Sequence, residues 1–394
     1  MMLLWRPVWF GGIVLVNVAL LVVTFFRYDF QHAGALGPFW QLFNLSSENN
    51  VAAWWSGMLL FFVALHSFDG FCLYRTERPA ASRGWLALSL VFLALSADEI
   101  ASFHERMHRF IGLGFWWSLL PFAVVLAALF LGGLYLVSSD RDQRGRAAGL
   151  FLGCLVLGFV ALQERWEHTL NWGDWRALRG VLEEGTELVG MSILLLTCMA
   201  NTRGIFRPRE PAVAPVFEGV VRLRMPITLL ATFLAPALAL GTASLDDLQR
   251  GHPADWLAAC LCMMAAIAVT GGFLRDGKGV GLPAVGLSAI CLLGSAGAVA
   301  VPAMRLVTFP GSGVAVSIRP LFFLALFAFG FFFCALGRDT RPGWALPTGI
   351  ALLLTVSALH PVLFLEFLLP SIFGLVFFYR LSCPEFGQEA APRS

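Results

Sequence analysis

The feature that most constrains this chain is a series of long, continuous apolar runs, most of them roughly 17–25 residues in length. A helix of that length crosses the hydrocarbon core of a bilayer, and continuous rather than alternating runs favour helices over a β-barrel. Hydrophobic residues make up 58% of the chain and charged residues 13%, which excludes an ordinary soluble domain. The sequence therefore predicts an all-α fold, a polytopic transmembrane helical bundle.

Twelve such runs are expected, and both termini are expected inside the cell. The runs are residues 8–26, 50–74, 85–110, 115–138, 147–168, 180–200, 226–243, 254–274, 281–302, 317–337, 343–358 and 361–381. The last two could form one helix, although Pro361 favours a break. Roughly two thirds of the Lys and Arg residues then fall in inside segments, as the positive-inside rule requires.

The runs divide into two predicted bundles. Residues 1–201 form a six-span bundle, residues 202–225 a basic, Pro-rich cytoplasmic linker, and residues 226–394 a second, apolar six-span bundle. The basic loop is accounted for by topology, so nucleic acid is not an expected partner.

Ionisable residues gather at one membrane level of the first bundle. The stretch "LSADEIASFHERMH" and the next residue supply Asp98, Glu99, Ser102, His104, Glu105, His108 and Arg109. Neighbouring run ends supply Glu48, Glu164, His168, Glu183, Glu184 and Glu187. The expected topology brings all of them to the extracytoplasmic side. Charged groups inside a membrane are costly, so they are paired, protonated, hydrated or bound to a cation.

The spacing of these residues predicts a divalent metal site. His104 and His108 fit H-E-x-x-H, in which two imidazoles bind zinc and the intervening Glu105 acts as a base. Glu105 and His108 also fit E-x-x-H, the spacing that holds paired iron or manganese in helix bundles. The expected metal ligands are His104, His108, Glu164, His168, Glu183, Glu184 and Glu187. Glu105 and Asp98 are the expected catalytic residues, and Glu48, Glu99, Ser102 and Arg109 support them.

These motifs carry a resemblance that covers roughly residues 40–200. "LSADEIASFHE" followed by "EEGTELVGM" resembles a family of uncharacterised bacterial multipass inner-membrane proteins with an LSxDExxxxHE helix and a later EExxExxG helix. The family's usual Pro before the second span is absent here. A looser likeness to alkaline ceramidases rests on Ser96, Asp98 and His104. The resemblance implies a bacterial inner-membrane location and supplies no reaction.

Three functions stay open. The favoured one is a metal-dependent membrane hydrolase acting on a lipid or peptide, with a di-metal oxidase as a variant. The second is a cation- or proton-coupled transporter, for which the best inward polar groups are His66, Ser67 and Asp69. The third is a structural membrane subunit whose acids form ion pairs with nearby arginines. Membrane lipids are expected partners, while the oligomeric state and a lid over residues 169–179 are left open.

Overall fold

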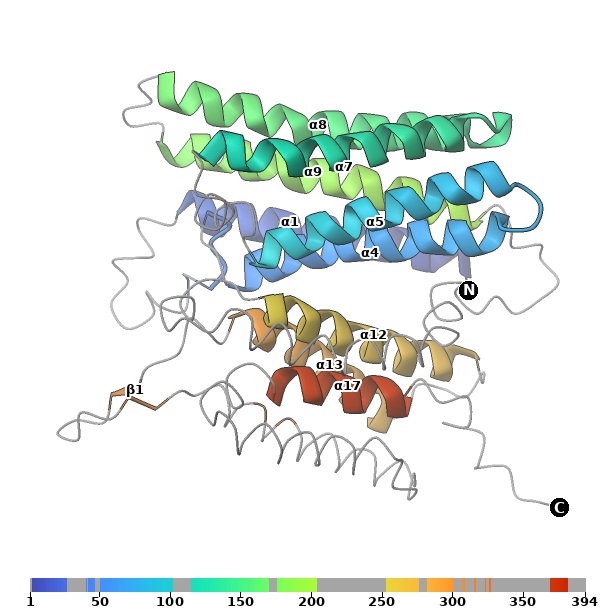
Figure 1. Cartoon of the computed structure of the whole chain (residues 1–394). Helices are drawn as coiled ribbons and strands as arrows, with labels where there is room; N and C mark the ends of the chain where they lie inside the picture. Colours follow the sequence, from blue (N-terminus) through green and yellow to red (C-terminus); the bar gives the residue numbers. More distant parts are fainter. Residues whose placement is uncertain are drawn as a thin grey trace, which may run out of the picture. The chain divides into compact units, whose positions relative to one another are not determined.

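The computed structural model describes most of the first half of the chain and selected helices of the second (Figure 1). The described residues are 2–26, 40, 42–46, 50–101, 115–169, 176–203, 253–275, 282–300, 307–308, 315–316, 323, 326 and 369–381. The chain forms two compact units, one made of Met1–Glu99 with Phe103–Ile205, the other of Ile100–Ser102 with Phe206–Ser394. The expected spans 226–243 and 343–358 lie outside the described residues.

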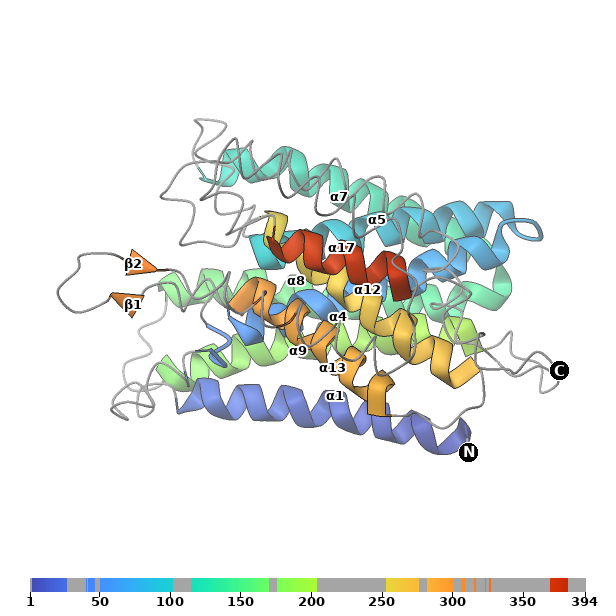
Figure 2. The ribbon, with the colours of Figure 1, turned by 90° about the horizontal axis from the view of Figure 1, so that it is seen from below.

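Unit 1 contains helices that succeed one another in alternating directions (Figures 1 and 2). They are α1 (Met2–Phe25), α4 (Val51–Tyr74), α5 (Pro79–Ala101), α7 (Phe115–Ser138), the short 3-10 helix η2 (Arg141–Gln143), α8 (Arg144–Thr169) and α9 (Arg176–Arg203). We call the end at which α5 and α8 finish and α9 begins the acidic end. The opposite end, at which α5 and α8 begin, is called the clamp end.

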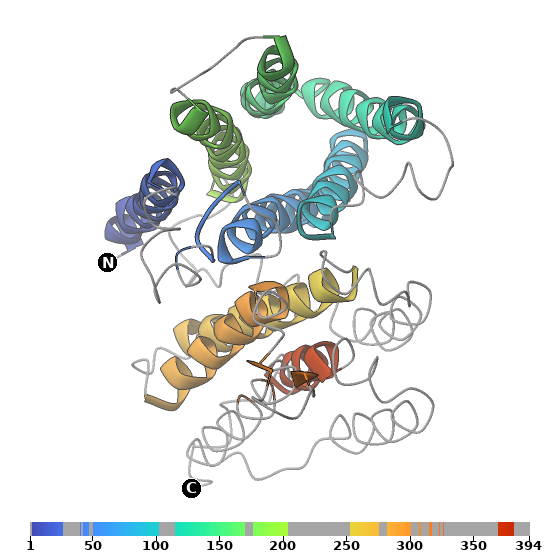
Figure 3. The same cartoon turned by 90° about the vertical axis from the view of Figure 1, so that its left-hand side faces the viewer.

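Five of these helices close a ring, seen end-on in Figure 3. Helix α9 packs against α4 and α8, and α8 packs against α7. Helix α5 completes the ring, because it hydrogen-bonds to α4 and approaches α7 at Gly84 and Gly133. Helix α1 lies outside the ring against α9. Helices are therefore present at all of the first six expected spans, with the expected ends for α7 and shifted ends for the others.

A ladder of buried serines joins α4 to α5. Three hydroxyls of α5 donate to backbone carbonyl oxygens of α4: Ser82 to Phe71 at 2.8 Å, Ser89 to Ala64 at 2.9 Å and Ser96 to Gly57 at 2.8 Å. Donors and acceptors both recur every seven residues, the period at which two antiparallel helices keep meeting in a left-handed crossing. Hydroxyl-to-carbonyl bonds of this kind join helices where water is absent.

A glycine pair allows two helices of the ring, α5 and α7, to approach closely. A Cβ placed on Gly84 would lie 2.6 Å from the carbonyl oxygen of Gly133, closer than real Cβ contacts come. By contrast, a Cβ on Gly132, which precedes Gly133 on α7, would meet nothing within 4 Å. Gly84 and Gly133 therefore let α5 and α7 pack backbone to backbone, as small residues do between membrane helices.

Three described helices are long and apolar enough to cross a membrane: Val51–Tyr74, Pro79–Ala101 and Leu120–Ser138. They differ in surroundings. In the most apolar stretch of α4, 61% is buried, against 17% for α7, which exposes Leu131 at 57% and Tyr135 at 74%. Helix α4 therefore belongs to the core of unit 1, whereas α7 presents an apolar outer face that suits lipid.

Unit 2 is described in its helices α12 (Pro253–Arg275), α13 (Leu282–Ala300) and α17 (Leu369–Leu381). Helix α12 packs against both others. Ser295 of α13 donates to the carbonyl oxygen of Ala259 at 2.8 Å, and Gly374 of α17 lies against Cys262. The described elements are helical, as expected, apart from a two-residue antiparallel ladder of β1 (Val307–Thr308) and β2 (Ala315–Val316).

Candidate functional site

Two of the expected site residues lie at the last turn of α5 that the structure describes. Asp98 and Glu99 are partly buried there and engage other residues. Two residues earlier, the fully buried Ser96 bonds to the carbonyl oxygen of Gly57 on α4. The hydrogen bond from Ser96 thus fixes the turn of α5 that carries Asp98 at the acidic end.

Three further acids lie near the beginning of α9, at the same end of unit 1. Glu183, Glu184 and Glu187 are all partly buried and all engage other residues. Glu164 and His168 lie on the last turns of α8, and the structure describes only their backbone. The alternating direction of the helices therefore brings these parts of three helices to one end of the unit.

A hydrogen bond between uncharged side chains joins two of these helices. Gln163 of α8 donates through Nε2 to the hydroxyl of Thr186 on α9 at 3.2 Å, and that hydroxyl donates to the carbonyl oxygen of Leu182 at 2.6 Å. Gln163 precedes Glu164 and Thr186 precedes Glu187, so this hydrogen bond joins α8 and α9 at the turns from which these acids come. Sequence reasoning missed this pair because it followed charged residues alone.

A second polar network joins three helices, α1, α4 and α9, through side-chain hydrogen bonds. The indole Nε1 of Trp55 on α4 donates to Oδ1 of Asn17 on α1 at 2.8 Å. Nδ2 of Asn17 donates in turn to the hydroxyl of Ser192 on α9 at 3.1 Å. Asn17 and Ser192 were not expected at the site. An Asn in the middle of an apolar first helix was the signal that could have found them.

The remaining expected site residues lie outside the described residues. They are Glu48, Ser102, His104, Glu105, His108 and Arg109. Within the described parts of the chain, no three His, Cys, Asp or Glu side chains lie close enough together to hold a metal ion. The predicted metal centre thus stays a prediction. The described acids still match the donor type that divalent zinc, iron or manganese takes, which is carboxylate oxygen.

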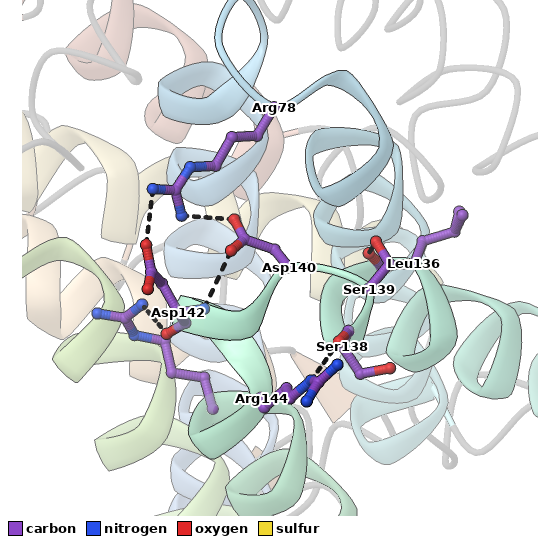
Figure 4. Close-up of polar contacts among 8 residues, drawn as sticks. Arg78, Leu136, Ser138, Ser139, Asp140, Asp142 and Arg144 are labelled. Atoms are coloured by element: carbon purple, nitrogen blue, oxygen red, sulfur yellow. Dashed lines mark hydrogen bonds and ion pairs between the residues drawn. The ribbon is translucent and has the colours of Figure 1, made fainter.

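The clamp end carries charge of a different kind (Figure 4). Arg78, between α4 and α5, pairs with Asp140, which precedes η2, and, at 2.8 Å, with Asp142 inside η2. Asp140 also accepts from the backbone N–H of Asp142 and caps this short helix. The hydrogen bonds from Arg78 to Asp142 and Asp140 raise the pKa of the guanidinium above its ordinary value. These ion pairs lie in connecting segments, where they link two helical hairpins.

Comparison with known proteins places the chain in a family. A family model described as a domain of unknown function, DUF8692, matches residues 5–202, half of the chain. The chain belongs to the DUF8692 family. No curated protein and no solved structure matches it.

The DUF8692 domain coincides with unit 1. Its bounds enclose nearly all of the residues from α1 to α9, and they include every expected site residue, from Glu48 to Glu187. Unit 2 lies beyond the match. The acidic end, the serine ladder and the clamp end of unit 1 therefore all lie within the DUF8692 domain.

Proposed function

We propose that this protein is a polytopic protein of the bacterial inner membrane that binds a divalent metal at the acidic end of its DUF8692 domain. In this proposal the chain has about twelve spans with both termini inside, so that the acidic end lies at the extracytoplasmic level. The LSxDExxxxHE and EExxExxG helices are proposed to be the shared elements of a bacterial family that use this site.

The observation that carries the proposal is the gathering of partly buried carboxylates at one end of unit 1. Asp98 and Glu99 come from α5, and Glu183, Glu184 and Glu187 from α9. An acid inside a bilayer costs about 2.5–3.5 kcal/mol at the centre and less near the interface. Several acids at one level would also repel one another. A divalent cation bound among them would offset both the cost of placing carboxylates in the bilayer and their mutual repulsion.

The proposed activity is hydrolysis of a lipid or peptide. His104 and His108 with acids of α8 and α9 would hold the metal, which would supply an activated water and polarise the scissile bond. Glu105 or Asp98 would take the proton from that water. Ser96, Gln163 and Trp55 would hold the turns that carry these groups, through the hydrogen bonds described above.

A transporter is the second candidate, because α4 also carries ionisable residues nearer the clamp end. The core between the two levels favours an enzyme instead. Its buried side chains include Leu59, Leu60 and Val63 of α4 with Leu188 and Leu194 of α9. A layer of such residues does not conduct ions without a large rearrangement.

Metal content of the purified full-length protein tests the proposal. Elemental mass spectrometry would compare the wild type with a Glu105→Ala/His108→Ala variant and a Glu184→Gln/Glu187→Gln variant. Asp142→Asn is the matched control, since it removes an acid at the clamp end. We expect about one zinc per chain in the wild type and the control, and a loss in both site variants.

The outcomes separate the candidate functions. Zinc lost in the site variants supports hydrolysis and justifies screens of lipid and peptide substrates. Iron or manganese near two per chain points to the di-metal oxidase variant. A well-folded wild type without bound metal rejects the proposed site, and the transporter or the structural ion-pair network then stands.

A further inference from the structure

Two arginines at the clamp end have no acidic partner in the described part of the chain. Arg141 lies in η2 and Arg144 begins α8, and both side chains are exposed. The two nearby acids, Asp140 and Asp142, are engaged by Arg78 instead. Arg141 and Arg144 form no ion pair with a described residue, so their positive charges are open to an external partner.

The guanidinium of Arg144 is held at the end of α7. Its Nε donates to the carbonyl oxygen of Ser138 at 3.3 Å, as Figure 4 shows. This hydrogen bond fixes the side chain and leaves its two terminal nitrogens available. A guanidinium in that state can donate two parallel hydrogen bonds to the oxygens of a phosphate group.

An exposed apolar face of α8 continues from these arginines toward the acidic end. Residues 147–162 carry no charge. The large apolar side chains of this stretch that are between 42% and 58% exposed are Phe151, Leu152, Leu155, Phe159 and Leu162. From Leu152 onward they recur every three or four residues, so they share one face of the helix.

Helix α7 adds a second apolar surface at the clamp end. Tyr135 is 74% exposed and Leu131 is 57% exposed, and both lie within two turns of Ser138. Helices α7 and α8 contact one another and are joined through η2. The α7–α8 hairpin therefore combines free positive charge at its turn with exposed apolar side chains on both of its helices.

This combination selects one kind of partner. A free phosphate or an acidic peptide would match the arginines but would leave the apolar faces uncovered. A lipid without net charge would cover the apolar faces but would not match the arginines. An anionic phospholipid does both, and each arginine near an anionic lipid headgroup strengthens binding by about fivefold.

We propose that the α7–α8 hairpin binds an anionic phospholipid at the clamp end. The phosphodiester group accepts hydrogen bonds from the terminal nitrogens of Arg144, and Arg141 adds a second positive charge. The acyl chains lie along the exposed apolar side chains of α7 and α8. This site rests on the proposed membrane location of unit 1 and does not depend on the metal proposed for the acidic end.

Native mass spectrometry of the full-length protein tests this inference. The detergent-purified protein would be titrated with dioleoyl phosphatidylglycerol or dioleoyl phosphatidylcholine, which have identical acyl chains and differ in net charge. We expect the first phosphatidylglycerol to bind at least about tenfold more tightly than phosphatidylcholine. In Arg141→Gln/Arg144→Gln this preference should fall below about twofold, and in the wild type it should weaken as the salt concentration rises.

A second pair of arginines provides the matched control. Arg75→Gln/Arg83→Gln removes two exposed arginines from the α4–α5 hairpin at the same end and changes the net charge by the same amount. This variant should keep the preference for phosphatidylglycerol. Millimolar inorganic phosphate should not displace the bound lipid, because it gains nothing from the apolar faces. Metal content should be the same in all of these variants.

Three results would overturn the inference. The first is equal binding of the two lipids by the wild type, which requires no variant to fold. The second is an equal loss of preference in both arginine pairs, which would assign the effect to net charge alone. The third is displacement of the lipid by inorganic phosphate, which would indicate a site for free anions. Metal content is read separately, so any of these results leaves the proposed metal site standing.

Discussion

Removal of the serine ladder should destabilise unit 1 by a small and additive amount. The perturbation is substitution of Ser82, Ser89 and Ser96 by alanine, singly and together. Hydrogen bonds between membrane helices contribute about 0.6 kcal/mol on average and at most about 1.7. The acceptors Gly57 and Ala64 lie inside α4, where each helical carbonyl oxygen also accepts from the backbone N–H four residues later. Removing the serine hydroxyls therefore leaves these two buried carbonyl oxygens hydrogen-bonded.

The expected free energies follow from the geometry. Each single substitution should lower the free energy of unfolding by about 0.6 kcal/mol, and the triple substitution by about 2. The rungs are seven residues apart, about 10.5 Å, so their effects should add within about 0.5 kcal/mol. Alanine also favours helix slightly over serine, which offsets part of each loss.

The assay is reversible unfolding of the full chain in bicelles, monitored by circular dichroism. Ser138→Ala is the control, because the hydroxyl of this partly exposed serine donates to the carbonyl oxygen of Tyr135 in its own helix, and the change should alter stability by less than about 0.5 kcal/mol. A triple variant as stable as the wild type would show that the ladder contributes nothing. A single substitution costing more than about 3 kcal/mol would show that the hydroxyls act through packing instead.

Three further substitutions test other contacts in unit 1. Gly84→Ala should lower the free energy of unfolding by about 1–3 kcal/mol, because the new Cβ meets the Gly133 carbonyl oxygen. The control, Gly132→Ala, should raise it by up to about 1 kcal/mol. If both substitutions had a similar effect in thermal unfolding, the close approach of α5 and α7 would be contradicted. Trp55→Phe should cost about 1–3 kcal/mol by leaving Asn17 Oδ1 without its donor, and adding Asn17→Leu should recover part of that loss in the same assay. Arg78→Gln should lower the unfolding midpoint slightly at low salt and by less near 1 M salt, since the pair with Asp142 is exposed and the pair with Asp140 is only partly buried. Because the pKa of Arg78 is raised, its contribution to stability is complete below the ordinary pKa of arginine and is lost only as the pH rises through the raised value. A loss of that contribution between pH 6 and 9 would therefore contradict this assignment.

The apolar pattern predicted the helices of unit 1 well where it was continuous. The expected 50–74 and 115–138 became α4 and α7 with ends within one residue. Helix α5 starts at Pro79 rather than at the expected 85. The difference arises because its first turns carry polar residues that look like loop, while proline is favoured at the first helical position.

The site could be predicted only in part. Charged residues in apolar runs are conspicuous, and the alternation of helix direction is enough to place Asp98 and Glu187 at one end. Uncharged partners such as Gln163 and Asn17 leave no periodic signal, and only coordinates reveal which helix they face. The serines at 82, 89 and 96 are an exception, because their seven-residue repeat is visible in the sequence.

The serine ladder has a consequence for how this domain can diverge. All of its acceptors are backbone carbonyl oxygens, so these hydrogen bonds do not depend on which residue type stands at Gly57, Ala64 or Phe71. A change at those positions needs no compensating change on α5. The α4–α5 contact should therefore leave little pairwise covariation among homologous sequences, although it fixes the register of the hairpin. What should persist is the serine spacing itself, and the hairpin should lengthen or shorten only in steps of seven residues.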